Sequence, residues 1–110
     1  MINEIDIEKA LDFIRDNSRD LAKAKADRIY LEQYRKSQKA ILFQQAPKGT
    51  VQDRECFAYS HEEYLQNIEG LKVAVEEEEK LKWLMVAAQL KVEVYRTQQA
   101  NNRMVDRSHA

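Results

Sequence analysis

The chain has only one proline and two glycines, and their positions constrain its fold more than any other feature. Pro47 and Gly49 both lie in the segment APKGT, residues 46–50, and neither residue type occurs from Asp6 to Gln45. An all-β fold needs many turns, which glycine and proline commonly form, so their scarcity argues against one. The sequence therefore predicts one clear loop between two long uninterrupted segments.

Before the loop, apolar residues recur at spacings of three and four, which is typical of an amphipathic helix. We expect a helix over about residues 6–45. The stripe that we expect it to bury consists of Ile7, Leu11, Ile14, Ser18, Leu21, Ala22, Ala26, Ile29, Tyr30, Tyr34, Ser37 and Ile41.

After the loop, the spacing of Thr50 and Asp53 is that of a capping box and predicts a short helix over about residues 51–58. In the segment SHEE, Ser60 is expected to cap a second long helix over about residues 61–103, with Glu63 reaching back. Gly70 predicts a bend or a close backbone contact in that helix, and residues 104–110 are expected to fray. The stripe expected to be buried is Tyr64, Ile68, Leu71 and Val75, followed by Leu81, Met85, Ala88, Val92, Tyr95, Gln99 and Asn102.

The segment KVEVY, residues 91–95, alternates like a β-strand over five residues. No turn signal adjoins it, no second strand-like segment could pair with it, and the helical spacing continues through it. The helix penalty of Val92 and Val94 is only a few tenths of a kcal/mol, so we interpret the segment as helical.

Composition limits the class of protein. The chain of 110 residues is 34% charged and 44% hydrophobic, with a formal net charge of −1. It is too apolar for a disordered chain, too charged for a membrane protein, and carries no overall field that would attract nucleic acid or an anionic membrane. The single cysteine, Cys56, cannot form an internal disulfide, and no signal pattern is seen, so the sequence predicts a cytoplasmic protein.

Charge is segregated along the chain. Basic residues dominate Lys23–Lys48 and acids dominate Glu62–Glu79. If the long helices form an antiparallel hairpin, these zones lie side by side, and a turn near residue 52 places Arg28 opposite about Glu76 and Lys25 opposite about Glu79. We expect these charges to set the register of a single helical domain, although each exposed pair is worth only about 0–1 kcal/mol.

A bare hairpin would leave apolar residues uncovered, namely Leu31, Leu42, Trp83, Leu84 and Val86. Self-association into a homodimer or a larger helical bundle would cover them. The alternative is a monomer in which the short helix packs on the hairpin.

Candidate reactive groups are few. Cys56 and His61 lack the further ligands that zinc needs and the third group that a nucleophile needs, so we interpret both as structural. Glu76 to Glu79 point around the whole helix and cannot converge on one ion. No phosphate loop, HExxH, GxSxG or CxxC occurs, so we expect no enzyme, no metal and no cofactor.

A basic zone with interleaved aromatic residues could bind DNA through phosphate contacts and stacking. Its candidate residues are Lys25, Arg28, Tyr34, Arg35, Lys36 and Lys39. The alternative is that the tyrosines are buried and the basic residues pair with the acidic helix. The polar segment Arg96–Arg107 holds residue types that read base edges, or it is simply a polar helix end. Trp83 is a candidate anchor for a protein partner, or it is buried in the protein's own core.

The stretches KADRIYLEQYRKSQKAIL, residues 25–42, and LKWLMVAAQLKVEVYRTQQANNRMVDR, residues 81–107, resemble small helical proteins of tailed bacteriophages and prophages. The resemblance implies a gene neighbourhood of recombination and replication functions, in a host cytoplasm, and no catalytic residue. The sequence thus predicts a non-enzymatic accessory protein of DNA metabolism that binds a phage or host protein, or DNA. The alternatives are a helical module that inhibits a host protein and a purely structural oligomerisation protein.

Overall fold

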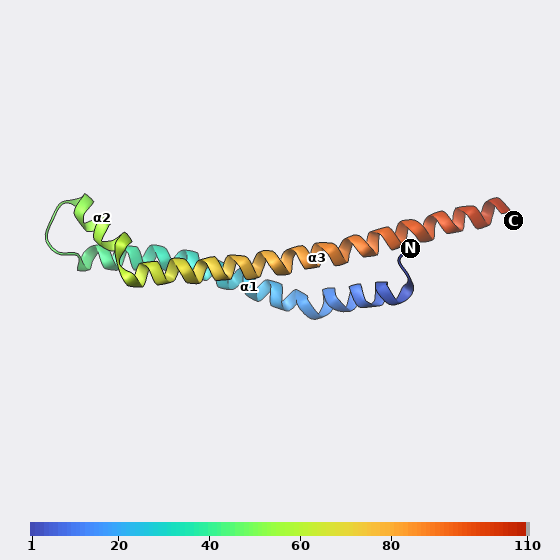
Figure 1. The fold of residues 1–110 in the computed structure, drawn as a ribbon, viewed down its shortest axis with the longest axis horizontal. Helices are drawn as coiled ribbons and strands as arrows, with labels where there is room; N and C mark the ends of the chain where they lie inside the picture. The colour runs from blue at the N-terminus through green and yellow to red at the C-terminus, as the bar shows by residue number, and fades with distance from the viewer. Residues whose placement is uncertain (110) are drawn as a thin grey trace. The chain divides into compact units, whose positions relative to one another are not determined.

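The computed structural model describes residues 1–109, and within them it contains three α-helices and no strand (Figure 1). Helix α1 spans Glu4–Gln45, α2 spans Val51–Ser60 and α3 spans Glu62–His109. The prediction of an all-α chain is confirmed, and KVEVY lies within α3. α3 also continues through residues 104–109, the part of the expected frayed tail that the structure describes.

The chain divides into two compact units. The loop unit, Ala22–Glu79, contains the second half of α1, all of α2 and the first part of α3. The terminal unit contains Met1–Leu21 and the part of α3 from Lys80 onward. Both units pair a segment of α1 with a segment of α3.

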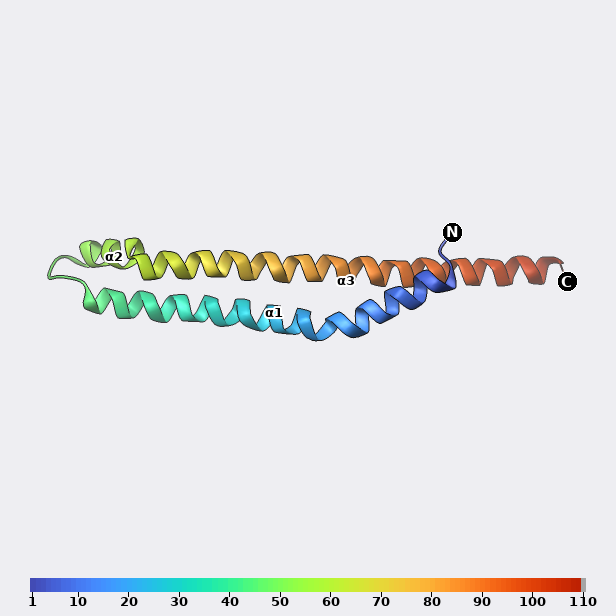
Figure 2. The same cartoon turned by 60° about the horizontal axis from the view of Figure 1, so that its bottom comes forward.

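In the loop unit, the segments of α1 and α3 lie side by side and run in opposite directions, as in a helical hairpin (Figure 2). α2 lies at the closed end of this hairpin (Figure 1). The core there joins all three helices, because Leu42, Ala58 and Tyr64 are almost completely buried and Phe43 packs against them. Burying a leucine side chain contributes about 1.5–3 kcal/mol, so this cluster is the main apolar anchor of the closed end.

Capping fixes where α2 begins. The Thr50 side chain accepts a hydrogen bond from the Asp53 amide at 3.1 Å, and the Asp53 carboxylate accepts one from the Thr50 amide at 3.2 Å. The capping box expected from the sequence is therefore confirmed. Arg54 then joins α2 to the end of α1, since its Nε donates to the Phe43 carbonyl at 3.2 Å and its guanidinium lies over the Phe43 ring.

The cap of α3 differs from the expectation. Ser60 is the last residue of α2, and its hydroxyl donates to the Cys56 carbonyl at 2.6 Å. His61 caps α3 instead: its Nδ1 accepts a hydrogen bond from the Glu63 amide at 3.1 Å, and its carbonyl accepts one from Leu65. The prediction was wrong because Ser60 uses its hydroxyl within the helix it ends, which leaves the imidazole as the acceptor for α3.

The terminal unit begins with a further cap, in which Asn3 Oδ1 accepts from the Asp6 amide at 2.9 Å. Ile7 and Ala10 of α1 and Met85 and Ala88 of α3 are its most buried apolar side chains.

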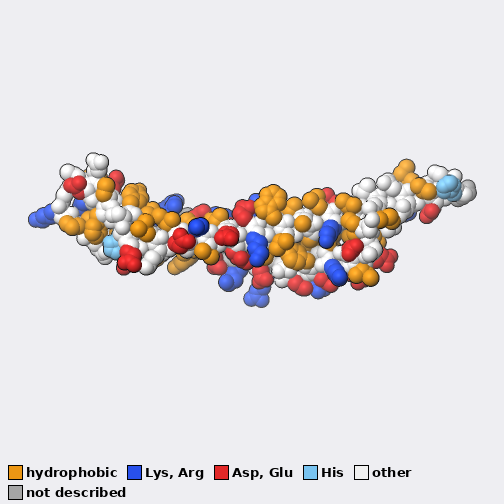
Figure 3. Space-filling view, viewed as in Figure 1, with side chains coloured by type: hydrophobic (Ala, Val, Ile, Leu, Met, Phe, Trp, Pro, Cys, Tyr) orange, Lys and Arg blue, Asp and Glu red, His pale blue; other side chains and the backbone are white. Residues whose placement is uncertain are grey.

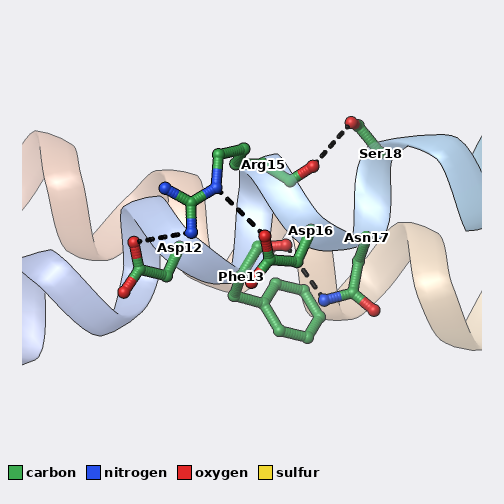
Figure 4. A network of polar contacts seen from close by, with 6 residues as sticks. All are labelled: Asp12, Phe13, Arg15, Asp16, Asn17 and Ser18. Carbon is green, nitrogen blue, oxygen red and sulfur yellow. Dashed lines mark hydrogen bonds and ion pairs between the residues drawn. The ribbon is translucent and has the colours of Figure 1, made fainter.

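Arg15, Asn17 and Ser18 of α1 form their hydrogen bonds and ion pairs within the helix itself (Figure 4). Arg15 forms ion pairs with Asp12 at 3.3 Å and Asp16 at 3.0 Å. The Asn17 amide donates to the Phe13 carbonyl at 3.0 Å. The half-buried Asn17 therefore needs no partner on α3 for this donor.

Burial in both units follows a strict alternation of three and four, the heptad pattern of a coiled coil. The buried and half-buried seam on α1 is Ile7, Ala10, Ile14, Asn17, Leu21, Ala24, Arg28, Leu31, Arg35, Gln38 and Leu42. On α3 it is Tyr64, Asn67, Leu71, Ala74, Glu78, Leu81, Met85, Ala88, Val92, Tyr95 and Gln99. We assign these residues to heptad positions a and d, with Arg28 and Glu78 at a.

This seam corrects the expected stripes of the loop unit. Ile29, Tyr30, Tyr34 and Ile41 of α1 and Ile68 and Val75 of α3 are exposed. In the terminal unit, Leu11 was also expected to be buried and is exposed. Leu31 and Leu42, which were expected to lie off the seam, belong to it. On α3 from Leu81 to Gln99 the expected stripe and the observed seam agree.

Gly70 makes no close contact, contrary to one of the two expectations for it. A Cβ built on Gly70 would meet nothing within 4 Å apart from the local helix. Its role is therefore not to admit a neighbouring backbone, and the space beside it belongs to a groove that we describe below.

Candidate interaction surface

A charged layer lies in the seam of the loop unit. The Arg28 Nε donates to one Glu78 oxygen, its Nη2 donates to the other at 3.2 Å, and its Nη1 donates to Glu32 at 3.0 Å. Arg28 and Glu78 side chains are only 24% and 13% exposed. The hydrogen bond to Glu78, and then that to Glu32, raise the pKa of Arg28 above its usual value, so the guanidinium is firmly charged.

The layer gives the register of the hairpin. Arg28 was expected opposite about Glu76, and the structure pairs it with Glu78, two residues further along α3. The physical reason is that Glu78 occupies a seam position, whereas Glu76 lies on the exposed side of the helix. Charge does pair α1 with α3 here, but it does so from within the seam.

A second polar layer lies nearer the loop. Asn67 Nδ2 donates to Gln38 Oε1, and Gln38 is only 8% exposed. A buried amide without a partner costs about 1–3 kcal/mol, so a shifted pairing of the helices would be penalised at this layer. The two layers together give the hairpin a register that apolar contacts alone would specify less strongly.

Several of the six candidates for DNA contact already have partners within the chain or lie in the seam. Arg28 is bound to Glu78 and Glu32, and Arg35 is half-buried in the seam. Lys39 Nζ lies 4.5 Å from the centre of the Tyr59 ring. A hydrogen bond to Tyr59 raises the pKa of Lys39. The exposed candidates are Lys25, Tyr34 and Lys36.

The remaining candidate groups are dispersed. Cys56 is exposed, His61 serves as a helix cap, and Glu78 holds Arg28. Within residues 1–109, no group of three or more His, Cys, Asp or Glu side chains is placed to hold a metal ion. Trp83 is 63% exposed on α3 of the terminal unit, and residues 101–107 of the polar segment are exposed as well.

The most conspicuous surface feature is apolar. Tyr30, Tyr34 and Ile41 are 67%, 43% and 52% exposed and form a second stripe on α1, beside the seam. The Tyr30 and Tyr34 rings are nearly parallel, with centroids 6.1 Å apart. Figure 3 shows hydrophobic side chains at the surface of both units between charged ones. A helix with two apolar stripes is typical of a bundle in which it contacts more than one neighbour.

Next to this stripe lies an open groove of about 410 Å³ between α1 and α3 of the loop unit. Ala24, Gly70 and Ala74 line it, together with Glu77 and with Asp27, whose carboxylate pairs with Lys23 at 3.4 Å. We call it the acidic groove. It exists because three small residues, one of them without a side chain, stand where larger ones would close the gap between the helices.

Sequence reasoning missed this groove. Its signal is the occurrence of small residues at seam and adjacent positions on both helices, which becomes visible only once the seam is assigned. The sequence identified Gly70 only as an interruption of the helix. Its contribution to the groove becomes clear only when Ala24 and Ala74 are seen to line the same space.

Comparison with protein-family models, curated proteins and solved structures finds no match to this chain. Over residues 1–109, no helix is long and apolar enough to cross a membrane.

Proposed function

We propose that the protein is a non-enzymatic helical interaction module that works by docking an apolar helix face against another protein. The observation that supports this most directly is the exposed second stripe of α1, Tyr30, Tyr34 and Ile41. α3 packs against the neighbouring seam and leaves this stripe uncovered. Contiguous exposed apolar side chains commonly mark contact sites between proteins.

The internal charge pairing also supports a protein partner over a nucleic acid. Of the six basic and aromatic candidates, Arg28 and Lys39 already hold partners within the chain. The resemblance to small phage proteins is the ground for seeking the partner among phage or host proteins of recombination and replication, in the cytoplasm of the host.

A photo-crosslinking amino acid placed at Tyr34 tests this function in cells that produce the protein. The matched control places the same group at the neighbouring Gln33, which lies on the side of α1 away from the seam. We expect covalent adducts with protein from position 34 and far fewer from position 33. If neither position yields a protein adduct, the module does not dock through this face.

DNA binding is the second candidate, and one observation favours it. The stacked pair of Tyr30 and Tyr34 is exposed and offers aromatic rings on which bases can stack. Fluorescence anisotropy with labelled single- and double-stranded DNA tests it. Binding through several phosphates must weaken steeply between low and physiological salt, and absence of binding at low salt would exclude it.

A further inference from the structure

We infer that the partner docked on the second stripe of α1 is a second copy of this chain, whose own stripe runs in the opposite direction. This inference rests on the proposed function and identifies its partner, and it concerns residues of the loop unit alone. In the heptads of α1 the stripe falls at positions c and g, where Tyr30, Tyr34, Ser37, Ile41 and Gln44 follow each other at spacings of four and three. That alternation is the spacing of a coiled-coil seam. We call these five residues the second seam.

No other part of the loop unit covers the second seam, because all five side chains are exposed. α2 packs on a different flank of α1, where Lys39 lies over the Tyr59 ring and the Arg54 guanidinium lies over the Phe43 ring. None of the five residues is charged, although 34% of the chain is. The buried centres of protein interfaces are depleted of charged residues and enriched in tyrosine. The second seam therefore has the composition of a contact site.

The second seam is complementary to itself when two copies run antiparallel. If Tyr30 of one copy faces Ile41 of the other, Tyr34 faces Ser37, and two-fold symmetry repeats both contacts. A large side chain then meets a small one at the centre of the contact, which allows the helices to interdigitate. In a parallel pair, Tyr34 would face Tyr34 and Ser37 would face Ser37, which would leave a gap at the serine layer.

Charge on α3 also favours the antiparallel arrangement. The two polar layers between α1 and α3 place the two-fold near the level of Gly70. The exposed Glu77 lies beyond that level, so at about 1.5 Å per residue the Glu77 carboxylates of the two copies are about 20 Å apart along the axis. That distance exceeds the Debye length of about 8 Å at physiological salt, and their repulsion is screened. A parallel pair would bring both carboxylates to the same level.

The contact is large enough for a stable dimer. It covers Tyr30, Tyr34 and Ile41, together with Val73, which lines the acidic groove with Tyr30 and is 59% exposed. At their exposed fractions, and with on the order of 200 Å² per large side chain, these residues contribute roughly 900 Å² over both copies. Stable interfaces bury about 1,200–2,000 Å² in total. Uncharged neighbours such as Ser37 and Gln44 make up the remainder.

Substitutions at one facing pair test the inference by analytical ultracentrifugation. We expect the wild type to sediment with twice the mass of the 13.0 kDa chain. Tyr30→Lys or Ile41→Glu alone should raise the dissociation constant on the order of a hundredfold, because each places an unpaired charge in the contact. Y30K/I41E combined in one chain should restore the dimer, since the introduced lysine of each copy faces the introduced glutamate of the other.

The fold should survive these changes, because positions 30 and 41 are exposed in the single chain. The two positions are about three helical turns apart, so the introduced charges cannot pair within one chain. Circular dichroism should show the same helix content in every variant. The matched control K36E reverses an exposed residue of α1 outside the second seam, and it should remain dimeric.

Spin labels measure the direction of the pairing. They are attached at K25C or K36C in chains that also carry C56S, which removes the exposed native cysteine. In the antiparallel dimer the two labels at position 36 lie at nearly the same level, whereas those at position 25 are about 30 Å apart along the helix axis. Electron paramagnetic resonance should therefore give a clearly longer distance for K25C than for K36C.

A wild type that stays monomeric at high concentration overturns the inference. So does a K25C distance no longer than that of K36C, since it indicates a parallel pair. Undiminished dimerisation of Y30K or I41E alone, a monomeric Y30K/I41E, or loss of the dimer in K36E would overturn it too. The proposed function fails by a different result, namely absence of adducts from Tyr34. Adducts with other proteins from a monomeric chain would leave that function standing without self-association.

Discussion

At the scale of single residues, His61 forms capping hydrogen bonds with both α2 and α3. It ends one helix and begins the next: its own amide donates to the Ala58 carbonyl of α2, while its Nδ1 accepts from the Glu63 amide of α3. Its ring also meets Phe57 edge to face at 5.6 Å. The start of α3 therefore uses the His61 side chain, whereas the end of α2 uses the His61 backbone.

Replacing His61 by alanine should lower the free energy of unfolding by about 0.5–2 kcal/mol, because the first turn of α3 loses its side-chain acceptor. His61→Asp should retain most of the stability, since a carboxylate at this position can accept the same amide. Urea denaturation followed by circular dichroism measures both. The control H109A, at the exposed end of α3, should match the wild type. Equal stability of H61A and wild type would show that the imidazole cap is dispensable.

Gly70 lowers the helix stability of α3, and neither the backbone conformation nor a close contact requires a glycine at this position. Since a Cβ there meets nothing within 4 Å, Gly70→Ala should stabilise the chain by about 0.5–1 kcal/mol through its better helix propensity. The measurement is urea denaturation at low protein concentration, where association contributes little. A loss of stability in G70A would mean that another chain segment approaches this position closely.

At the scale of the helices, two polar layers define how α1 meets α3. Arg28 and Glu78 form one layer, and Gln38 and Asn67 form the other. Each layer joins a side chain of α1 to one of α3, so a slip along the seam would separate both pairs at once. These polar residues specify the register of α1 against α3, although they add little buried apolar area.

The amide layer predicts a pattern among three variants. Gln38→Leu or Asn67→Leu alone should cost about 1–3 kcal/mol, because the remaining amide is left without its partner. The double variant should recover most of that loss, since neither polar group then remains. Urea denaturation of all four proteins completes the double-mutant cycle. Additive losses would mean that the two amides act independently.

The charged layer predicts a different rescue. Arg28→Glu should lower the melting temperature, because it sets like charges beside Glu78 and Glu32 in the seam. Adding Glu78→Arg should restore part of the loss by reversing the pair. The control R15E changes an arginine that is 72% exposed and should have a small effect. A double variant no more stable than R28E would show that the pair does not align the helices.

Sequence patterns predicted where the helices lie in the chain, but they predicted the wrong buried face for α1 in the loop unit. The position of Pro47 and Gly49 and the cap at Thr50 mark real boundaries, because local backbone chemistry determines them. α1, however, carries two stripes with the same spacing. Tyr30 and Ile41 belong to the more apolar one, yet α3 covers the stripe that contains Arg28, Arg35 and Gln38.

The choice between the stripes depends on partners that are distant in the chain. Arg28 and Gln38 are acceptable in the seam only because Glu78 and Asn67 face them, separated by 50 and 29 residues. A hydrophobicity pattern identifies the apolar stripes of each helix separately. It does not show which polar residue of the other helix will face a given position. The same limitation hid the acidic groove, since its small residues come from both helices.

At the scale of the whole molecule, the two units differ in how the chain connects them. The loop unit is closed by a short connection and by the Leu42, Ala58 and Tyr64 core, whereas the terminal unit brings together two segments distant in the chain. The last turns of α3, residues 101–109, are exposed. Stability should therefore differ between the units.

Hydrogen exchange of the full chain should reveal this difference. Amides around Leu42 and Tyr64 should exchange most slowly, those of Met1–Leu21 faster, and those of residues 101–109 fastest, because few buried contacts hold them. Mass spectrometry of peptide fragments at low protein concentration gives the comparison. Uniform protection in both units would show that they open as one cooperative body.

The closed end of the loop unit also has a consequence for the order of folding. The facing amides Gln38 and Asn67 are 29 residues apart in the chain, and the facing charges Arg28 and Glu78 are 50 apart. The entropy lost in bringing two segments together rises with the length of chain between them, so pairing next to the turn is the least costly start. The helices of the hairpin should therefore pair first next to the turn and then progressively further from it. Each polar layer that forms shortens the unpaired chain between the two residues of the next layer.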